Sequence, residues 1–149
     1  SEARGLSAER KAFEMVQIQH LSDTYPSDLS LRYDLGVLQL EAGETTLAIQ
    51  SFQRAQANPH REIASLIQIG RCFAKRGMND MAANTLQKAL EKKEVMDDEK
   101  MDLHYQLGYV LNSMGRTEES LDQFKIIYER DIGYRDVADR VDAYYASLG

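Results

Sequence analysis

The chain has 149 residues, enough for one domain with a continuous core but too few for two of ordinary size. Its net charge of −6 repels phosphate backbones and argues against nucleic acid as a partner, and no apolar run approaches the roughly 18 residues of a membrane span. The single Cys72 excludes an internal disulfide framework and favours a reducing, cytoplasmic location.

The first predicted element is an amphipathic helix over residues 7–24. Ser7 is expected to open it, and Pro26 to end it, because a proline disfavours helix in the residue before it. Its apolar residues are Phe13, Val16, Ile18 and Leu21. The chain begins with Ser1, without the apolar core of a secretory signal, which suggests a trimmed fragment.

A glycine pattern then recurs three times. Gly70 follows Gly36 by 34 residues, and Gly108 follows Gly70 by 38. Seven residues after each comes a second glycine, at Gly43, Gly77 and Gly115. Full repeats are therefore predicted at 29–62, 63–96 and 101–134, with an inserted extension at 97–100. The predicted helices of these repeats are 28–42, 45–57, 60–76, 79–94, 97–114 and 117–130.

Each repeat is expected to be a helix pair, because its apolar residues are spaced for one helix face. The first glycine lies in mid-helix, where it costs about 1 kcal/mol, so close contact with the second helix must offset it. The second helix supplies a small residue and then a bulky one: Ala48 and Phe52, Ala82 and Leu86, Ser120 and Phe124.

The second glycine of each repeat suits the left-handed conformation that ends many helices. Polar residues two positions later are expected to cap the free N–H groups of the next helix. These residues are Thr45, Asn79 and Thr117.

The last element, a helix over 135–148, is predicted to cover the end of the core. Stacked repeats need a terminal helix with one apolar and one polar face. The apolar face is expected to hold Val137, Val141, Tyr144 or Tyr145, and Leu148, with charged residues opposite.

This pattern resembles the tetratricopeptide family, whose 34-residue repeat carries Leu-Gly early, Ala-x-x-x-Phe in the second helix and Pro near its end. The resemblance implies an all-α, right-handed superhelix (α-solenoid) forming a single domain over 1–149. It has an N-terminal half repeat ending at Pro26, three full repeats and a C-terminal capping helix. The family's early Trp position holds Arg32, Leu66 and His104, and its early Tyr position Gln39, Phe73 and Leu111. The segment 131–138 is similar to closing segments of bacterial repeat proteins and suggests a bacterial source.

The resemblance also implies a scaffold that binds a peptide or protein segment in a concave groove. The positions that match family groove residues are Tyr33, Val37, Ile67, Gln68, Arg71, Lys75, Tyr105 and Tyr109. A ligand is expected to contact Ile67, Tyr105 and Tyr109, with Arg71 favouring an acidic or phosphorylated segment.

A structural alternative stays open, in which the repeats self-associate or act as a spacer within a larger protein. Catalysis, a cofactor and a metal are not expected. His20, His60 and His104 are scattered without ligand spacing, and His104 is better explained as a packed ring with one hydrogen bond. Cys72 is interpreted as a small buried apolar group.

Overall fold

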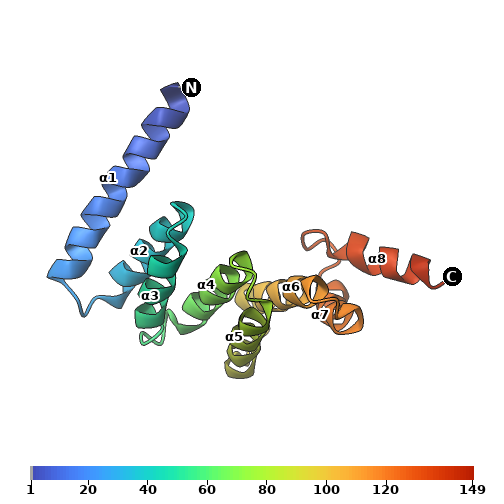
Figure 1. Ribbon diagram of the computed structural model, residues 1–149. Coiled ribbons are helices and arrows are strands. Elements are labelled where there is room, and N and C mark those ends of the chain that lie inside the picture. Colours follow the sequence, from blue (N-terminus) through green and yellow to red (C-terminus); the bar gives the residue numbers. More distant parts are fainter. Residues whose placement is uncertain (1) are drawn as a thin grey trace. The chain divides into compact units, whose positions relative to one another are not determined.

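The computed structural model describes residues 2–149, with side chains from residue 5 onward, so Ser1 lies outside the described residues. These residues form eight helices and no strand (Figure 1). The helices are α1 (Glu2–Thr24), α2 (Leu29–Glu41), α3 (Thr45–Ala55), α4 (Glu62–Lys75), α5 (Asn79–Lys92), α6 (Asp98–Ser113), α7 (Thr117–Arg130) and α8 (Val137–Ser147). The predicted all-α fold is confirmed.

The chain divides into two compact units, Ser1–Cys72 and Phe73–Gly149, with the boundary inside α4. In the first unit, α2 packs against both α1 and α3. In the second, α6 packs against α5 and α7, and α8 packs against α7. The assignment of residues 1–149 to one domain stays a prediction.

The second glycine of each repeat ends its helix in the same way. Left-handed φ angles of +80°, +74° and +77° occur at Gly43, Gly77 and Gly115. After α2, the N–H of Glu44 donates to the carbonyl of Gln39 at 2.9 Å, and the N–H of Gly43 donates to that of Leu40 at 3.0 Å. This pair of bonds is the Schellman motif, and it recurs after α4 and α6. The predicted role of these glycines is confirmed.

The predicted side-chain caps at Thr45, Asn79 and Thr117 are wrong. Helices α3, α5 and α7 already begin at these residues, and no side chain makes a capping bond there. The reason is the turn itself, which places the residue after the glycine directly at the N-cap. Those N-cap residues are Glu44, Met78 and Arg116.

The predicted start of the first helix is also wrong. Helix α1 begins at Glu2, so Ser7 lies inside the helix and does not open it. Four of residues 2–6 (Glu, Ala, Arg and Leu) favour helix, and the helix extends through them and Gly5 by more than a turn before Ser7. The end is as predicted, at Thr24, before Tyr25 and Pro26.

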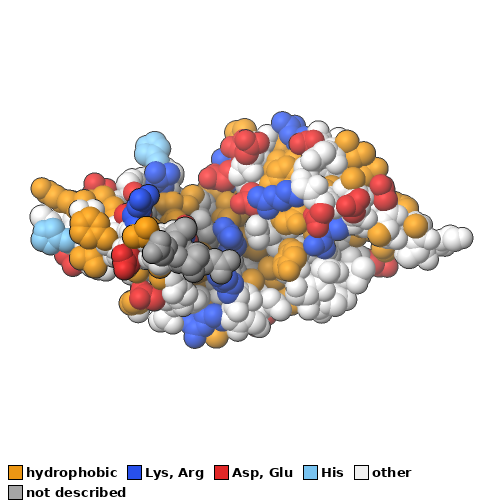
Figure 2. Space-filling view, turned by 90° about the horizontal axis from the view of Figure 1, so that it is seen from above, with side chains coloured by type: hydrophobic (Ala, Val, Ile, Leu, Met, Phe, Trp, Pro, Cys, Tyr) orange, Lys and Arg blue, Asp and Glu red, His pale blue; other side chains and the backbone are white. Residues whose placement is uncertain are grey.

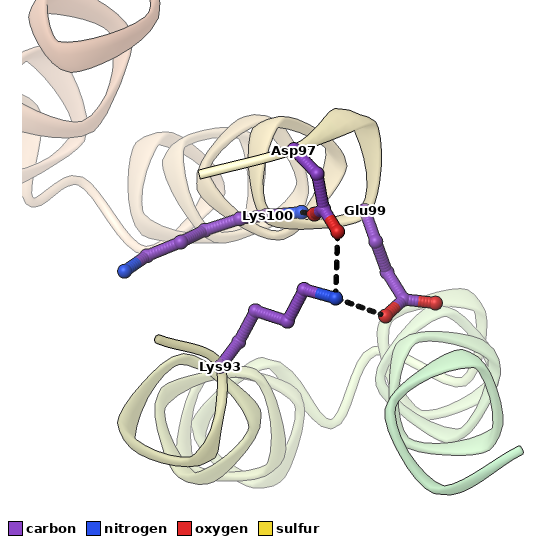
Figure 3. A network of polar contacts seen from close by, with 4 residues as sticks. All are labelled: Lys93, Asp97, Glu99 and Lys100. Carbon is purple, nitrogen blue, oxygen red and sulfur yellow. Dashed lines mark hydrogen bonds and ion pairs between the residues drawn. The ribbon is translucent and has the colours of Figure 1, made fainter. Parts of the chain in front are cut away.

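The four-residue extension at 97–100 lengthens α6 and does not form a loop. Asp97 is the N-cap, and its side chain accepts the N–H of Lys100 at 3.0 Å. At the end of α5, Lys93 Nζ lies 2.7 Å from Asp97 Oδ2 and 3.1 Å from Glu99 Oε1 (Figure 3). The bond to Asp97, followed by that to Glu99, raises the pKa of Lys93. This cation therefore fastens the added turn to the preceding helix.

The first-helix glycines make room for an aromatic ring. A Cβ added at Gly36 would lie 2.7 Å from Phe52 Cε1, and one at Gly108 would lie 2.9 Å from Phe124 Cε1. The closest group is thus the phenylalanine ring and not the small residue expected to face the glycine. Ser120 still contacts the same site, since its hydroxyl donates to the carbonyl of Gly108 at 2.6 Å.

Two departures from the family pattern are buried polar pairs between the helices of one repeat. Gln39, at the early Tyr position, accepts a hydrogen bond from the hydroxyl of Ser51 at 2.6 Å. His104, at the early Trp position, lies 2.7 Å from Gln123 Oε1 through Nδ1. Both pairs are buried or half-buried, so each polar group has a partner where an aromatic ring would otherwise fill space.

Helix α8 covers the core of the second unit as predicted, but with fewer residues. Val137 and Val141 are buried beside Phe124 and Ile127, and Tyr144 packs against the same cluster. Leu148 lies beyond the helix and is exposed, so its assignment to the apolar face is wrong. Leu148 is the C-cap residue after Ser147, and the residues that pack against this cluster end at Tyr144, one turn earlier.

Candidate functional site

A chain of polar contacts joins α2 to α4 in the first unit. The hydroxyl of Tyr33 accepts a hydrogen bond from Gln68 Nε2 at 3.3 Å. Gln68 Oε1 in turn accepts one from Arg71 Nη1 at 3.4 Å. We call Tyr33, Val37, Gln68 and Arg71 the α2–α4 surface. Arg71 is exposed and the other three are half-buried, so the surface presents a cation beside an amide and a phenol.

Tyr33 is held in place from two further sides. Its ring meets the buried Phe52 edge-on, with 5.4 Å between centroids. The guanidinium of Arg61 lies 5.2 Å from the Tyr33 centroid, within cation–π range. A ligand would therefore meet a positioned ring, with Arg61 over the ring and Arg71 joined to the ring hydroxyl through Gln68.

The structure brings together only part of the predicted groove set. Ile67 is 6% exposed and offers little surface to a ligand. Lys75 is exposed but falls in the second unit, as do Tyr105 and Tyr109. The predicted ligand contacts at Ile67, Arg71, Tyr105 and Tyr109 draw on both units, so their combination stays a prediction.

In the second unit, Tyr105 is engaged by its own chain. Its hydroxyl donates to Asp136 Oδ1 at 2.7 Å. Its ring packs edge-on against Phe124 and Tyr134, and Arg135 lies 4.7 Å above its centroid. Burial, then the bond to Asp136, raises the pKa of Tyr105. Tyr105 is half-buried, as Tyr33 is, so its predicted role as a ligand contact stays a prediction.

Arg135 and Arg140 place two positive charges beside α6, the helix that carries Tyr105. Arg135 has a left-handed φ of 43° and pairs with Asp102 at 3.1 Å. Arg140 lies 5.5 Å from the centroid of Tyr109, which remains 50% exposed. Burial opposes the charged form of Asp136, but hydrogen bonds from Tyr105 and Arg140 outweigh it and lower the pKa of Asp136.

Sequence reasoning missed these contacts because it assigned the charges after residue 134 to the outer face of a capping helix. The sequence does contain a spacing that fits these contacts. Asp136 and Arg140 are four residues apart, as are Tyr105 and Tyr109, so each pair lies on one helix face. The two faces complement one another in hydrogen bonding and cation–π contact.

A cleft of about 320 Å³ lies among α5, α6 and α7 in the second unit. Leucines of α6 form part of its lining, and polar side chains of the second helices form much of the rest. The lining residues are Ala83, Asn84, Gln87, Leu107, Leu111, Arg116, Glu119, Asp122 and Gln123. Arg116 pairs with Glu119 at its edge, so the principal cation of the cleft already has a partner.

Within residues 2–149, no group of three or more His, Cys, Asp and Glu side chains is placed to hold a metal ion. His104 is 8% exposed and bonded to Gln123, which confirms its interpretation as a packed ring. Cys72 is fully buried, which agrees with its interpretation as a small core residue.

We expect stability to fall as the pH drops through about 6.5, the ordinary pKa of histidine, because of His104. Burial lowers its pKa below the ordinary 6.5, although the bond to Gln123 acts the other way. The folded protein keeps the ring neutral, whereas the unfolded chain takes up a proton, so more protons are bound when unfolded and acid favours unfolding. Urea titrations at several pH values should show this slope.

His104→Gln should flatten that slope, while the control His60→Gln, at an exposed turn, should keep it. An identical pH profile in His104→Gln and the native chain would contradict the assignment to His104.

Charge is mixed over the surface in view. On the face drawn in Figure 2, the described acidic and basic side chains are interspersed and form no continuous basic area.

No helix among the described residues is both long enough and apolar enough to cross a membrane.

Comparison with known proteins supports the repeat assignment. Residues 64–92 match the sequence profile of the tetratricopeptide repeat. A crystal structure of MamA is similar with a TM-score of 0.79 and 16% identity, covering 98% of this chain and 83% of that chain. YrrB, described as a TPR protein with an unusual peptide-binding site, gives 0.71 and 20%, covering 95% and 71%. No curated protein sequence matches the chain. Because the sequence identities to MamA and YrrB are only 16% and 20%, the structural similarity establishes the shared fold and nothing beyond it.

Proposed function

Because the chain is a tetratricopeptide-repeat protein, we propose that it acts as a scaffold that holds a segment of another protein and catalyses no reaction. The likeness to YrrB supports binding of a peptide, since that protein is described by its peptide-binding site. The α2–α4 surface is the proposed docking site in the first unit.

The observation that carries this proposal is the connected series Arg71, Gln68 and Tyr33, which spans two neighbouring first helices. An exposed guanidinium, an amide and a phenol can each bond to an extended main chain or to an acidic side chain. Tyr33 is already fixed by Phe52 and Arg61, so binding loses less side-chain entropy.

The ligand favoured by this chemistry is an acidic or phosphorylated segment. Arg61 lies over the Tyr33 ring and Arg71 is linked to the Tyr33 hydroxyl through Gln68. Guanidinium groups bind carboxylates and phosphates in bidentate fashion. The chain as a whole has a net charge of −6, so a local pair of arginines would distinguish such a segment from non-specific contacts.

We expect Arg71→Glu to weaken the binding of acidic and phosphorylated peptides, measured on a peptide array, by more than about tenfold, or roughly 1.4 kcal/mol. The reason is loss of the exposed cation and its replacement by a repelling carboxylate. The matched control is Lys88→Glu, an exposed charge reversal of the same sign on α5. Circular dichroism should show unchanged helicity in both.

The α2–α4 surface is rejected if Arg71→Glu binds as tightly as the native chain, or if Lys88→Glu weakens binding equally. The second result would point to the overall charge as the cause.

A further inference from the structure

The cleft among α5, α6 and α7 has room because a small residue occupies a position that is otherwise filled. Ala83 of α5 is in register with Ile49, 34 residues earlier, and with Leu121, 38 residues later. Ile49 and Leu121 are both buried branched side chains, whereas Ala83 leaves space and lines the cleft. The volume of about 320 Å³ is at the lower end of the range for ligand pockets, enough for one long side chain and the peptide groups beside it.

The cleft combines an apolar floor with polar walls. Ala83, Leu107 and Leu111 are almost fully buried and line the cleft, so the aliphatic part of a ligand would rest on them. Asn84 and Gln87 are exposed, lie one turn apart on α5 and supply carboxamide groups along one wall. This lining suits a side chain that is aliphatic along its stem and polar at its end.

The charge that the lining leaves without a partner is negative. Arg116 binds Glu119 twice, through Nε and through Nη2, the latter at 2.8 Å. Asp122, on the same helix as Glu119, is exposed and forms no ion pair within the part of the chain that the structure describes. Lys125 lies 5.2 Å from the centroid of Tyr145, and its pKa is raised first by Tyr145 and to a smaller extent by Asp122. The ammonium of Lys125 is therefore engaged with α8, and the Asp122 carboxylate stays open to a cation.

The carboxamides of the cleft can bind the main chain of a ligand. Gln123 Oε1 lies 2.7 Å from His104 Nδ1, so the amide nitrogen of Gln123 is the group left to donate to a carbonyl. Asn84 and Gln87 each offer both donors and an acceptor. An extended protein segment presents peptide N–H and C=O groups that match these amides, which a free cation without peptide groups would leave unused.

We propose that this cleft binds an arginine side chain of a protein segment, with its methylene stem on Leu107 and Leu111 and its guanidinium at Asp122. The planar guanidinium has five donors and can bond to the carboxylate and to a neighbouring carboxamide oxygen at once. An acidic side chain would instead have to break the pair of Arg116 and Glu119 and approach Asp122. The cleft shares no residue with the α2–α4 surface, and its ligand has the opposite charge.

Nuclear magnetic resonance titration of the native chain with blocked Ala-Ala-Arg-Ala-Ala tests the proposal. The side-chain amide signals of Asn84, Gln87 and Gln123 should shift, and the same peptide with norleucine in place of arginine should bind about threefold to fivefold more weakly. The peptide with glutamate should cause no shift. No shift with the arginine peptide, or equal binding of the norleucine or glutamate peptide, would overturn the proposal. Equally tight binding of arginine amide alone would exclude a protein segment as the ligand.

Two variants locate the bound peptide in the cleft. Asp122→Asn should weaken binding of the arginine peptide by about threefold to fivefold, the contribution of one exposed ion pair. The matched control is Asp139→Asn, the same change at an exposed position of α8 outside the cleft, which should bind like the native chain. Ala83→Ile should abolish binding by filling the cleft, without lowering the midpoint of urea unfolding. Undiminished binding in Asp122→Asn, or an equal loss in Asp139→Asn, would contradict this site.

Arg71→Glu separates this site from the α2–α4 surface. It should leave binding of the arginine peptide unchanged, since Arg71 does not line the cleft. A loss in this variant as large as that in Asp122→Asn would place the arginine peptide elsewhere and reject the cleft.

Discussion

We expect Phe124→Ala to lower the free energy of unfolding of the second unit by about 3–5 kcal/mol, the cost of emptying a large buried site. The ring is 3% exposed and belongs to the buried cluster of α6, α7 and α8. It also fills the space beside Gly108, packs edge-on against Tyr105 at 5.7 Å and lies beneath Arg140 at 5.0 Å. Urea unfolding followed by circular dichroism measures the loss.

The control for this variant is Ile126→Ala on the same helix. Ile126 is exposed, so its truncation should change stability by no more than about 0.5 kcal/mol. Comparable losses in both variants would mean that the Phe124 cluster is not the core of the second unit.

The second large effect is expected at Gly36. Gly36→Leu should destabilise the first unit by about 1–3 kcal/mol or more, because its Cβ would lie 2.7 Å from a carbon of the fully buried Phe52 ring. The gain in helix propensity of about 1 kcal/mol offsets part of this strain. The midpoint and slope of urea unfolding give the net change.

Gly5→Leu is the matched control, since nothing lies within 4 Å of a Cβ at that helical position. It should stabilise α1 slightly, through propensity alone. Adding Phe52→Leu to Gly36→Leu should cost less than the sum of the two single changes, because the smaller side chain removes the clash. Strict additivity would show that the two residues do not contact one another.

The sequence by itself determined the repeat spacing, the number of helices and the three left-handed turns. These features depend on residues close together in the chain: a helix face repeats every three or four residues, and a Schellman turn closes within six. The interpretation of His104 as a packed ring rested on the resemblance to the repeat family, whose early aromatic position it occupies; Leu66 at this position is also buried, whereas Arg32 is half-buried.

Only the tertiary structure decided which side chains remain available for binding. Tyr33 and Gln68 are 35 residues apart, and Tyr105 and Asp136 are 31 apart, so a pattern within one helix shows which residues share a face but not which residue of another helix each one contacts. The first contact ends a polar series at the exposed Arg71, and the second bonds the half-buried Tyr105 to its own chain. The apolar residues of α1 were likewise visible in the sequence, but which of them are exposed depends on where α2 packs. Burial is a property of the packed assembly of helices, and it therefore cannot be read from the periodicity of one helix alone.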